Sequence, residues 1–517
     1  MNIRNILVTS MIFVRLALSC GVSGSYEPER PSKPDKPGTD ETVESALALP
    51  HIMSGGMVLQ QESEVSIYGT DDRGVKVTVS PSWTDRSFEA VTGSDGRWIA
   101  KVKTPKGSDK AYTIRITDSN KGEKVINDVL VGEVWLCSGQ SNMEHPMKGF
   151  SSSEPVQDSE KELSDAAYPQ FRYFKVPQAV SRTAKYDTGE SSWAECSRDN
   201  AKNFEAIAFF FGRRIHKATG VPVGIIGCAY GGTRIEGWMP PESFTKLAKN
   251  EYMDSDKLSA GKNSPSAPSN CWNAMLLPVL DYGFKGILWF QGESNCNYYW
   301  SYSHLLQVMV ADWRERKGDG SARIPFYFAQ LAPWVNNRPI SNGGSELLRN
   351  AQMTAFKTIP NCGIIGLGDV GSESTIHFPN KKVPAERFAL WALYNEYGDK
   401  SVNPMGPAFE SLKAEGGKLL VSVSNASGLH IADGIGDIPY AEISGDGKTF
   451  NIPYAEISGD GKTFIPATLR ILSGGILEFS SPEVSSPTSA RYCFSGWHAG
   501  SVFNSAGLPL FPFRASL

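Results

Sequence analysis

The sequence predicts an α/β protein in which a doubly wound parallel sheet is flanked, before and after it in the chain, by β-sandwich-like modules. Between residues 129 and 400, apolar strand-like runs alternate with longer helical stretches, as buried parallel strands do. On either side, short segments of alternating polarity are separated by turn signals such as DDRG and GSDG. The five predicted parallel strands are residues 129–137, 222–228, 285–290, 325–331 and 363–367.

The predicted organisation, in chain order, is a signal segment (1–20), a disordered linker (21–46), an N-terminal β module (47–128), the α/β domain (129–400) and a C-terminal β module (401–517). The linker contains PERPSKPDKPGTD, whose proline and charge content is typical of a disordered tether. A helical stretch in the α/β domain, FEAIAFFFGRRIHKATG, ends on a glycine that is expected to cap it. The length of 517 residues fits several domains of ordinary size.

The first twenty residues predict export. Arg4 precedes an apolar stretch from Ile6 to Leu18, which suits a secretion signal and is too short to span a bilayer. The sequence LALSC is similar to a bacterial lipoprotein cleavage site with Cys20 as the lipidated residue, and simple secretion is the alternative. We therefore expect an exported protein, either a periplasmic or outer-membrane lipoprotein or a secreted one, that meets a membrane only through a lipid anchor at Cys20.

Charge and cysteine content exclude several classes of partner. A net charge of −4 favours neither nucleic acid nor an anionic membrane surface. Cys20 is one of eight cysteines, and the others form no CxxC motif and no Cys/His pair with zinc spacing. The sequence therefore predicts no nucleic-acid partner, no metal and no cofactor.

One segment, IPYAEISGDGKTF, occurs twice without change, at residues 438–450 and 452–464. Two perfect copies predict a local duplication of one hairpin arm rather than a solenoid, whose repeats are not confined to two identical copies. Because two identical strands cannot occupy one position in a module, we expect one copy to be extruded or added at an exposed edge.

Polar, glycine-rich motifs follow each of the five predicted parallel strands. They are SGQSNMEHP, GCAYGGTRIEGW, WFQGESNCN, FAQLAPW and GDVGSESTIHFPNKK. The carboxyl ends of parallel strands meet at one edge of a sheet, which is where doubly wound folds bind their ligands. The sequence therefore predicts a functional site at that edge.

Ser141, in VWLCSGQSNM, is the candidate nucleophile. Asn142 and Met143 follow it, so the sharp GxSxG elbow of α/β-hydrolases is disfavoured. A serine hydroxyl needs a base, and His377 is the best of seven histidines because it follows the last parallel strand, on the predicted functional edge. His145 is close to Ser141 in sequence and is expected to be structural.

Four of these blocks resemble those of a known family. GEVWLCSGQSNME, GGTRIEGW, KGILWFQGESN and DVGSESTIHFPNKK are similar to the sequence blocks of sialate O-acetylesterases, within the SGNH (GDSL-like) hydrolases. The similarity extends to LPHIMSGGMVLQQ and to the C-terminal GLPLFPFR, and it covers about residues 47–517. It implies a flavodoxin-like SGNH esterase domain at residues 129–400 that removes acetyl groups from sugars.

The resemblance also implies roles for single residues. Ser141 is the nucleophile and His377 the base. The oxyanion donors are the main-chain N–H groups of Ser141 and Gly232 together with one side-chain amide. For that amide Gln291 is favoured over Asn295 because it comes first after the strand, and capping of the following helix explains Asn295 at least as well.

Three charged residues of the same blocks complete the candidate site. Glu293 is expected to orient its neighbours. Arg234 and Glu236 are expected to line the sugar site, and a surface ion pair explains them about as well.

The acid member of the triad is left open. Relatives often place an aspartate two or three residues before the histidine, where this chain has Thr375 and Ser374. Asp369, immediately after the strand, is the expected partner of the His377 ring, and Glu373 is a further candidate. The remaining alternative is a serine–histidine dyad in which a carbonyl orients the ring.

The predicted function is a serine esterase that removes O-acetyl groups from carbohydrate through an acetyl-enzyme intermediate, with O-acetylated sialic acid as the expected substrate. Acetylated plant oligosaccharides such as xylan are the alternative substrate. A catalytically silent glycan-binding protein is the alternative from another class, because the acid near His377 is missing. A lipid esterase or thioesterase is disfavoured because the sequence shows no apolar lid segment.

Overall fold

The computed structural model describes most of the chain. The described residues are 45–248, 264–320, 322–335, 344–432, 442–443, 449–451 and 454–517. Residues 45–517 form one compact unit, whereas the predicted signal segment, Cys20 and most of the predicted linker lie outside the described residues. Within the described ranges, no helix is long and apolar enough to cross a membrane.

A largely parallel sheet forms the centre of the unit and contains all five predicted parallel strands. Its strands are β7 (Glu123–Gly139), β8 (Ala167–Lys175), β9 (Trp193–Ser197), β10 (Val223–Ala229), β11 (Gly286–Phe290), β12 (Phe326–Ala329) and β13 (Cys362–Ile365). Their order is β13-β12-β11-β7-β10-β8-β9, and only β9 runs antiparallel to its neighbour. Every residue of β10, β11 and β12 is buried, which explains why these strands are continuous apolar runs in the sequence.

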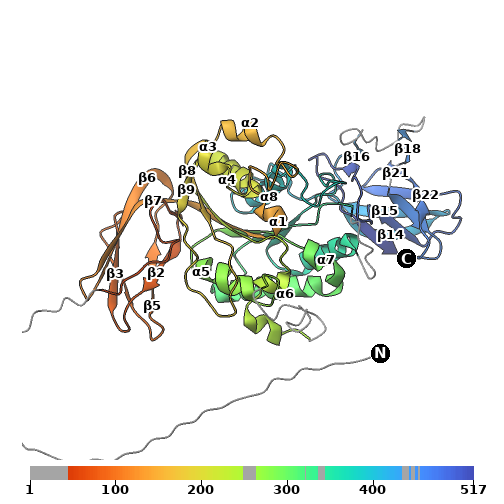
Figure 1. The fold of residues 1–517 in the computed structure, drawn as a ribbon. Helices are drawn as coiled ribbons and strands as arrows, with labels where there is room; N and C mark the ends of the chain where they lie inside the picture. The colour runs from red at the N-terminus through yellow and green to blue at the C-terminus, as the bar shows by residue number, and fades with distance from the viewer. Residues whose placement is uncertain are drawn as a thin grey trace, which may run out of the picture. The chain divides into compact units, whose positions relative to one another are not determined.

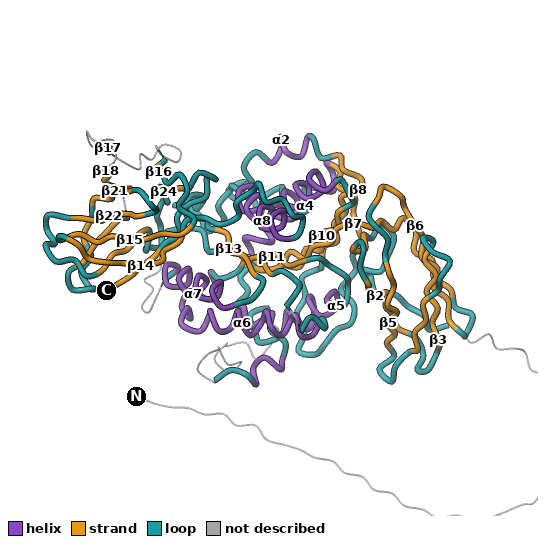
Figure 2. The backbone as a smooth tube through the Cα atoms, turned by 180° about the vertical axis from the view of Figure 1, so that it is seen from behind, coloured by secondary structure: helices purple, strands orange, loops and turns teal. Residues whose placement is uncertain are grey.

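Helices cover both faces of the central sheet, as in a doubly wound fold. The longer helices are α4 (Ala206–Thr219), α6 (Tyr299–Arg316), α7 (Ser345–Thr358) and α8 (Lys382–Asn395), and the short ones are α1 (Ser141–Glu144), α2 (Ser159–Ser164), α3 (Arg198–Ala201) and α5 (Leu277–Leu280). Helices α4 and α8 pack together on one face, and α6 and α7 pack together on the other (Figures 1 and 2). Gly220 ends α4 with a φ of +69°, which confirms the predicted glycine cap.

The N-terminal β module is continuous with the α/β domain through β7. The first half of β7 pairs antiparallel with β6, and its second half lies between β10 and β11. The predicted boundary after residue 128 therefore falls inside one strand, and the module and the domain share one hydrophobic core. The other strands of the module are β1 (Val58–Gln60), β2 (Glu64–Thr70), β3 (Lys76–Pro81), β4 (Phe88–Val91), β5 (Arg97–Lys103) and β6 (Ser108–Asp118).

The C-terminal β module has a hydrophobic core of its own. It contains a six-stranded sheet in the order β14-β15-β22-β21-β18-β17 and a four-stranded sheet in the order β20-β19-β23-β25, besides the pair β16-β24. Its strands are β14 (Ala408–Glu415), β15 (Lys418–Ser424), β16 (His430–Ile431), β17 (Glu442–Ile443), β18 (Thr449–Asn451), β19 (Ala455–Ser458), β20 (Ile465–Pro466), β21 (Thr468–Leu472), β22 (Ile476–Ser480), β23 (Ser489–Tyr492), β24 (Val502–Phe503) and β25 (Phe513–Ser516).

The two copies of IPYAEISGDGKTF lie in different sheets. The first copy contributes β17, which is the last strand of the six-stranded sheet, and most of β18 beside it. The second copy contributes β19, which lies between β20 and β23 of the four-stranded sheet. Much of the first copy lies outside the described residues, but its strands agree with the expectation that one copy is added at an edge.

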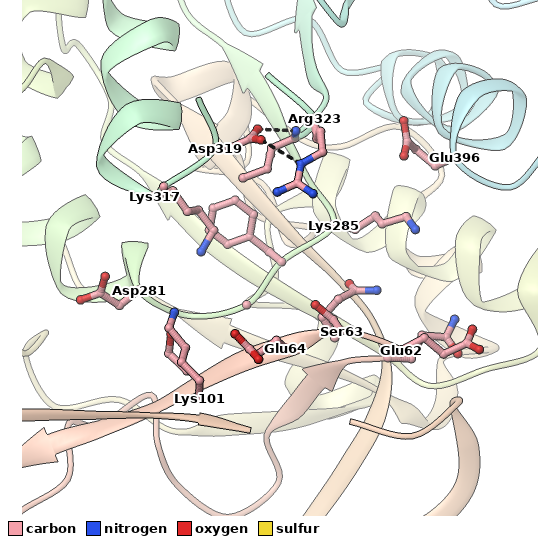
Figure 3. Close-up of a pocket in the computed structure, with 17 residues that line it drawn as sticks. Glu62, Ser63, Glu64, Lys101, Asp281, Lys285, Lys317, Asp319, Arg323 and Glu396 are labelled. Atoms are coloured by element: carbon pink, nitrogen blue, oxygen red, sulfur yellow. Dashed lines mark hydrogen bonds and ion pairs between the residues drawn. The ribbon is translucent and has the colours of Figure 1, made fainter. Parts of the chain in front are cut away.

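A charged pocket of about 500 Å³ lies at the amino-terminal end of the central strands (Figure 3). Its lining includes Lys285 and Ile324, which come just before β11 and β12. Arg323 pairs with Asp319 there, and Lys317 donates to two main-chain carbonyls. Because the glycine-rich motifs follow the strands, this pocket lies at the opposite end of the sheet from the predicted site.

Candidate active site

Ser141 lies where β7 ends and α1 begins. Gly139, at the end of β7, has a φ of +142°, and a Cβ there would come within 2.1 Å of the Phe290 carbonyl oxygen on β11, so the approach of the two strands requires glycine. Ser141 is 9% exposed, and its Oγ lies 2.9 Å from Nε2 of His377. The structure therefore brings the predicted nucleophile and base into hydrogen-bond contact.

The other ring nitrogen of His377 is bound by Glu154, a residue that the sequence analysis missed. Nδ1 lies 2.7 Å from Glu154 Oε1. Thr375 Oγ1 accepts the main-chain N–H of His377 at 3.0 Å and donates to the same carboxylate oxygen at 3.4 Å. A carboxylate at Nδ1 favours the tautomer with its proton there, which leaves Nε2 to accept the proton of Ser141.

The prediction that Asp369 orients His377 is wrong. Both carboxylate oxygens of Asp369 accept hydrogen bonds from the Arg387 guanidinium of α8, at 2.7 and 2.6 Å. The pair is largely buried, so the Asp369 side chain braces α8 against the loop after β13. Glu373, the other candidate, is exposed. The dyad alternative does not describe the site either, because Glu154 occupies the position of the third member.

The loop that carries Glu154 is held by His145. The buried ring of His145 donates from Nε2 to the main-chain oxygen of Glu154 at 2.9 Å. It stacks on Phe150 at 4.5 Å between centroids, and Phe150 in turn meets the His377 ring edge-on at 5.2 Å. Burial and the nearby positive charge of Lys381 lower the pKa of His145 to about 4, so the ring is neutral at neutral pH. His145 is thus structural, as the sequence predicted.

The Glu154 carboxyl group is disposed to stay ionised. Partial burial acts to raise its pKa, but the hydrogen bond and the charge that His377 brings, with a further hydrogen bond from Thr375, outweigh burial and leave the pKa below its usual range. An ionised carboxylate at this position stabilises the imidazolium that forms when His377 takes up a proton.

Ser141 and His377 line a pocket of about 510 Å³ at the carboxyl edge of the central sheet, where the motifs predicted a site. Among the residues that the structure describes, those lining the pocket include three glutamates but no lysine or arginine. The lining residues are Gln140, Ser141, Glu144, Phe150, Glu154, Gly231, Gly232, Glu293, Ser294, Ile376 and His377.

Two main-chain N–H groups of this pocket can bind a developing oxyanion. Among the described residues, the N–H groups of Ser141 and Gly232 donate to no other group. Gly232 has a φ of +72°, a conformation that favours glycine. The neighbouring N–H of Gly231 donates to Glu144 Oε2 at 2.6 Å, which fixes the turn that carries Gly232.

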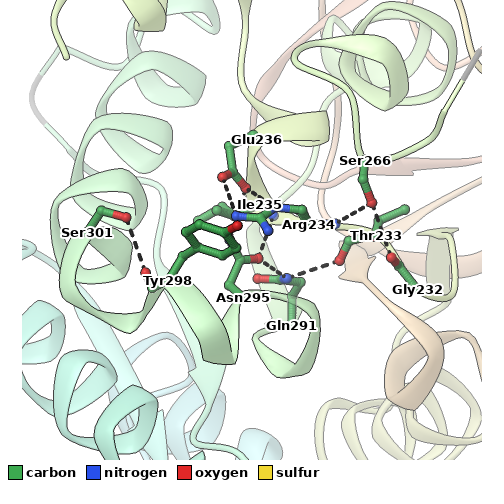
Figure 4. Close-up of polar contacts among 10 residues, drawn as sticks. All are labelled: Gly232, Thr233, Arg234, Ile235, Glu236, Ser266, Gln291, Asn295, Tyr298 and Ser301. Atoms are coloured by element: carbon green, nitrogen blue, oxygen red, sulfur yellow. Dashed lines mark hydrogen bonds and ion pairs between the residues drawn. The ribbon is translucent and has the colours of Figure 1, made fainter. Parts of the chain in front are cut away.

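The predictions for the side-chain amides are wrong. Gln291 and Asn295 are fully buried and are not among the described lining residues of the pocket. Nε2 of Gln291 donates to the Thr233 carbonyl oxygen at 3.1 Å and to Asn295 Oδ1 at 2.7 Å, so both of its protons are used (Figure 4). Asn295 Oδ1 also accepts the N–H of Ile235 at 3.0 Å. It therefore caps the short 3-10 helix η1 (Ile235–Trp238) and not the helix that follows it.

Arg234 and Glu236 form a buried ion pair, neither a surface pair nor a lining of the pocket. Nη2 of Arg234 lies 2.8 Å from Oε1 of Glu236, and the side chains are 8% and 0% exposed. Asn295 donates to Glu236 at 2.9 Å, and the Arg234 guanidinium lies 4.2 Å from the centre of the Tyr298 ring (Figure 4). These contacts hold the loops after β10 and β11 together.

Glu293 does contact its neighbours at the pocket, as expected. Its Oε1 accepts a hydrogen bond of 2.6 Å from Nδ2 of Asn142, the residue after the candidate nucleophile. The same amide donates to the Ile376 carbonyl oxygen at 3.2 Å, and its Oδ1 accepts from Lys381 Nζ at 2.5 Å. Sequence reasoning did not single out Asn142 or Lys381 for any role.

These groups have the arrangement found in serine hydrolases. A serine hydroxyl contacts an imidazole, a carboxylate binds the other ring nitrogen, and two main-chain N–H groups beside them are unpaired. Among the residues that the structure describes, no three His, Cys, Asp or Glu side chains gather in a way that could hold a metal ion.

Comparisons with known proteins agree with this class. The family model for carbohydrate esterases of the sialic acid-specific acetylesterase type matches residues 131–384. Sialate O-acetylesterase of Rattus norvegicus is 29% identical over 407 residues, which cover 68% of this chain and 74% of that protein. The Homo sapiens sialate O-acetylesterase is 27% identical over 404 residues, which cover 72% and 75%. The crystal structure of a carbohydrate acetylesterase from Xanthomonas citri matches with a TM-score of 0.75 and 27% identity, over 91% of this chain and 100% of that one.

The chain belongs to the sialate O-acetylesterase family of carbohydrate esterases. It is a carboxylic ester hydrolase that removes O-acetyl groups from carbohydrate.

Proposed function

We propose that Ser141, His377 and Glu154 are the nucleophile, the general base and the ring-orienting acid of this esterase. The observation that carries the proposal is the unbroken contact from Ser141 Oγ through the His377 ring to Glu154, with distances of 2.9 and 2.7 Å. A hydroxyl is a weak nucleophile until a base accepts its proton, and a base is effective when a third group fixes its ring.

In the first half-reaction, Ser141 Oγ attacks the acetyl carbonyl carbon while its proton passes to Nε2 of His377. The negative charge that develops on the carbonyl oxygen accepts hydrogen bonds from the N–H groups of Ser141 and Gly232. The tetrahedral intermediate collapses, the C–O bond to the sugar breaks, and His377 returns the proton to the sugar oxygen. Water, deprotonated by His377, then attacks the acetyl-serine carbonyl carbon. The bond from that carbon to Ser141 Oγ breaks, His377 returns the proton to Ser141 Oγ, and acetate leaves.

Glu154 also bears on the alternative of a silent glycan-binding protein. That alternative depended on the missing acid near His377, and a carboxylate in contact with Nδ1 removes its basis. The proposal includes an SGNH-type fold for the α/β domain, which the doubly wound parallel sheet and the serine at the end of β7 support.

We propose O-acetylated sialic acid as the substrate, on the strength of the family to which the chain belongs. Glu144, Glu154 and Glu293 line the pocket without a lysine or arginine among the described lining residues, so the sugar's own carboxylate would be repelled inside it. The acetylated hydroxyl therefore enters the pocket while the carboxylate stays outside.

The same acidic lining favours a second candidate, an O-acetylated neutral sugar such as a xylan oligosaccharide, which brings no charge to the pocket. Acetate release from O-acetylated sialic acids and from acetylated xylo-oligosaccharides, measured as kcat/KM, decides between the two. We expect at least a tenfold preference for the sialic acids, and a preference of that size for the neutral sugars would transfer the assignment to them. Export, with or without a lipid on Cys20, stays a prediction from the first twenty residues.

A further inference from the structure

Lys381, Asn142 and Glu293 form a continuous hydrogen-bonded chain beside Ser141 and His377; the first two side chains are buried and Glu293 is half-buried at the wall of the pocket. Lys381, which is 0% exposed, donates to Asn142 Oδ1, and Asn142 Nδ2 donates to Glu293 Oε1. We call this set the Lys381–Asn142–Glu293 chain. The Lys381 ammonium also lies 3.9 Å from the centre of the Phe378 ring, next to His377 in sequence.

The chain joins the three segments that build the site. Asn142 follows the nucleophile on α1, and Glu293 begins a short 3-10 helix (Glu293–Tyr298) just after β11. Lys381 and the Ile376 carbonyl oxygen, which accepts from Asn142 at 3.2 Å, belong to the segment that carries His377. Placing a lysine in a protein interior, linked through an amide to a half-buried glutamate, costs free energy that apolar side chains of similar size would not cost. The arrangement therefore needs a reason other than stability.

We propose that the Lys381–Asn142–Glu293 chain positions the His377 segment and sets the pH range in which His377 acts as a base, with Lys381 lowering the acid limit of that range and Glu293 raising it. This inference rests on the proposed roles of Ser141 and His377. Asn142 acts by holding the Ile376 carbonyl, and the two charged residues act on the His377 ring through space.

Among the described ionisable groups around His377, Lys381 is the one that supplies a positive charge under mildly acidic conditions. Glu154 binds Nδ1 directly, and Glu144 is another lining residue of the same pocket. The His145 ring centroid is 6.0 Å away, and that ring stays neutral because burial lowers its pKa to about 4.

The two charges of the chain differ in strength under mildly acidic conditions. Burial lowers the pKa of Lys381 to about 7, against the opposing effect of Glu293 and Glu154, so the ammonium carries its full charge below pH 6. Burial raises the pKa of Glu293, so its negative charge weakens at a higher pH than that of an exposed glutamate as the solution is acidified. Removal of Lys381 should therefore have the larger effect.

The test is the acid limb of the pH profile of kcat/KM, which reports the base of the free enzyme. Lys381→Met removes a positive charge that opposes protonation of His377, so the limb should move to higher pH by roughly half a unit to one unit. Glu293→Gln removes a negative charge and should move the limb to lower pH by a smaller amount. The double variant should return the limb close to its parental position.

Matched controls are available next to both positions. Lys382→Met changes the adjacent lysine, which is half exposed and pairs with Glu162, and Glu373→Gln changes an exposed carboxyl group near His377 in sequence. Neither control should shift the limb by more than about 0.2 unit, since solvent screens exposed charges. If Lys381→Met does not fold, Lys381→Gln makes the same change of charge and keeps a donor for Asn142.

Asn142→Ala tests the positioning role. It should lower kcat by about tenfold to a hundredfold with little change in KM, as expected for a displaced base. The inference would be overturned if the acid limb of the kcat/KM profile did not move in Lys381→Met and Glu293→Gln, or if it moved in the same direction in both variants. Such a result would leave the proposed function intact, because every variant keeps Ser141, His377 and Glu154, whereas activity in Ser141→Ala would remove both.

Discussion

Glu154 Oε1 lies 2.7 Å from His377 Nδ1, although 223 positions separate the two residues in the chain. The acid reaches the histidine from the loop between α1 and α2, shortly after the nucleophile, and not from the histidine's own segment. His145 holds the main chain of that loop, and Thr375 holds the carboxylate. The position of the acid is therefore determined by contacts made on both sides of the pocket.

Glu154→Gln should lower kcat by about 10³–10⁴, because an amide can stabilise the wrong tautomer of His377 and cannot balance the imidazolium charge. The measurement is steady-state kinetics on an acetylated sugar, with circular dichroism to verify folding. KM should change little.

Asp369→Asn is the matched control for that variant. It weakens the ion pair with Arg387 but leaves His377 and its partner in place, so it should lower the melting temperature while kcat stays within about tenfold of the parent. Greater loss of kcat from Asp369→Asn than from Glu154→Gln would show that the orienting acid is misassigned.

Gly232→Ala should lower kcat by about tenfold to a hundredfold and change KM much less. A Cβ at this position meets no atom within 4 Å, but the φ of +72° is unfavourable for alanine, so the turn should shift and misplace the N–H group offered to the oxyanion. The control is Gly220→Ala at the end of α4, where φ is +69° and space is also open. Both variants should lose similar stability, and equal losses of kcat would exclude Gly232 from the oxyanion site.

Glu205, at the start of α4, should make the protein less stable as the pH rises. Burial raises the pKa of Glu205 from 4.5 to about 8, so between these values the folded state holds a proton that the unfolded chain releases. The free energy of unfolding should therefore fall across this window, by up to about 4–5 kcal/mol at and above pH 8. Glu205→Gln should remove this loss, so the variant's advantage in urea unfolding should grow from pH 5 to pH 8.

The exposed Glu190→Gln is the control for the pH dependence of stability, and it should follow the parent at every pH. If Glu205→Gln also lost stability in parallel with the parent, the buried carboxyl group would not be the source of the effect.

Removal of residues 438–451 should leave esterase activity and expression near the parental level. The deletion takes away β17 and β18 from one end of the six-stranded sheet and leaves β19 in its place between β20 and β23. The second copy of the repeat stays complete. An insoluble deletion protein would show that both copies are needed for the core of the C-terminal module.

The central strands could be predicted because parallel strands buried on both faces are continuous apolar runs. The last two strands at one end of the sheet could not: β8 contains a proline and alternates in burial at its start, and the edge strand β9 is short. The boundary after residue 128 was misplaced because β7 belongs to both the module and the α/β domain, and a change of pattern within one strand resembles a domain border.

Ser141 and His377 could be predicted because strand ends and glycine-rich motifs mark the edge of the sheet. Glu154 could not, because SSSEPVQDSEK has the composition of a solvated acidic loop and nothing in it indicates a contact with a histidine more than two hundred residues away. Asp369 lies just after the last parallel strand, where an acid was expected, but its carboxylate is bound by Arg387 of the following helix, α8. Gln291 was misassigned because the direction of a side chain after a strand depends on the loops that meet it.

Acetate release from an O-acetylated sugar, measured for the parent protein and for Ser141→Ala, is the most direct test of the role of Ser141 as nucleophile. A change from serine to alanine at the start of α1 removes one hydroxyl and leaves the packing nearly unchanged, so both proteins should have the same circular dichroism spectrum and similar melting temperatures. We expect the rate to fall by several orders of magnitude and only the parent to form an acetyl-enzyme, seen by mass spectrometry as an added acetyl group on the Ser141 peptide. Retained turnover in a folded Ser141→Ala protein would contradict the serine mechanism.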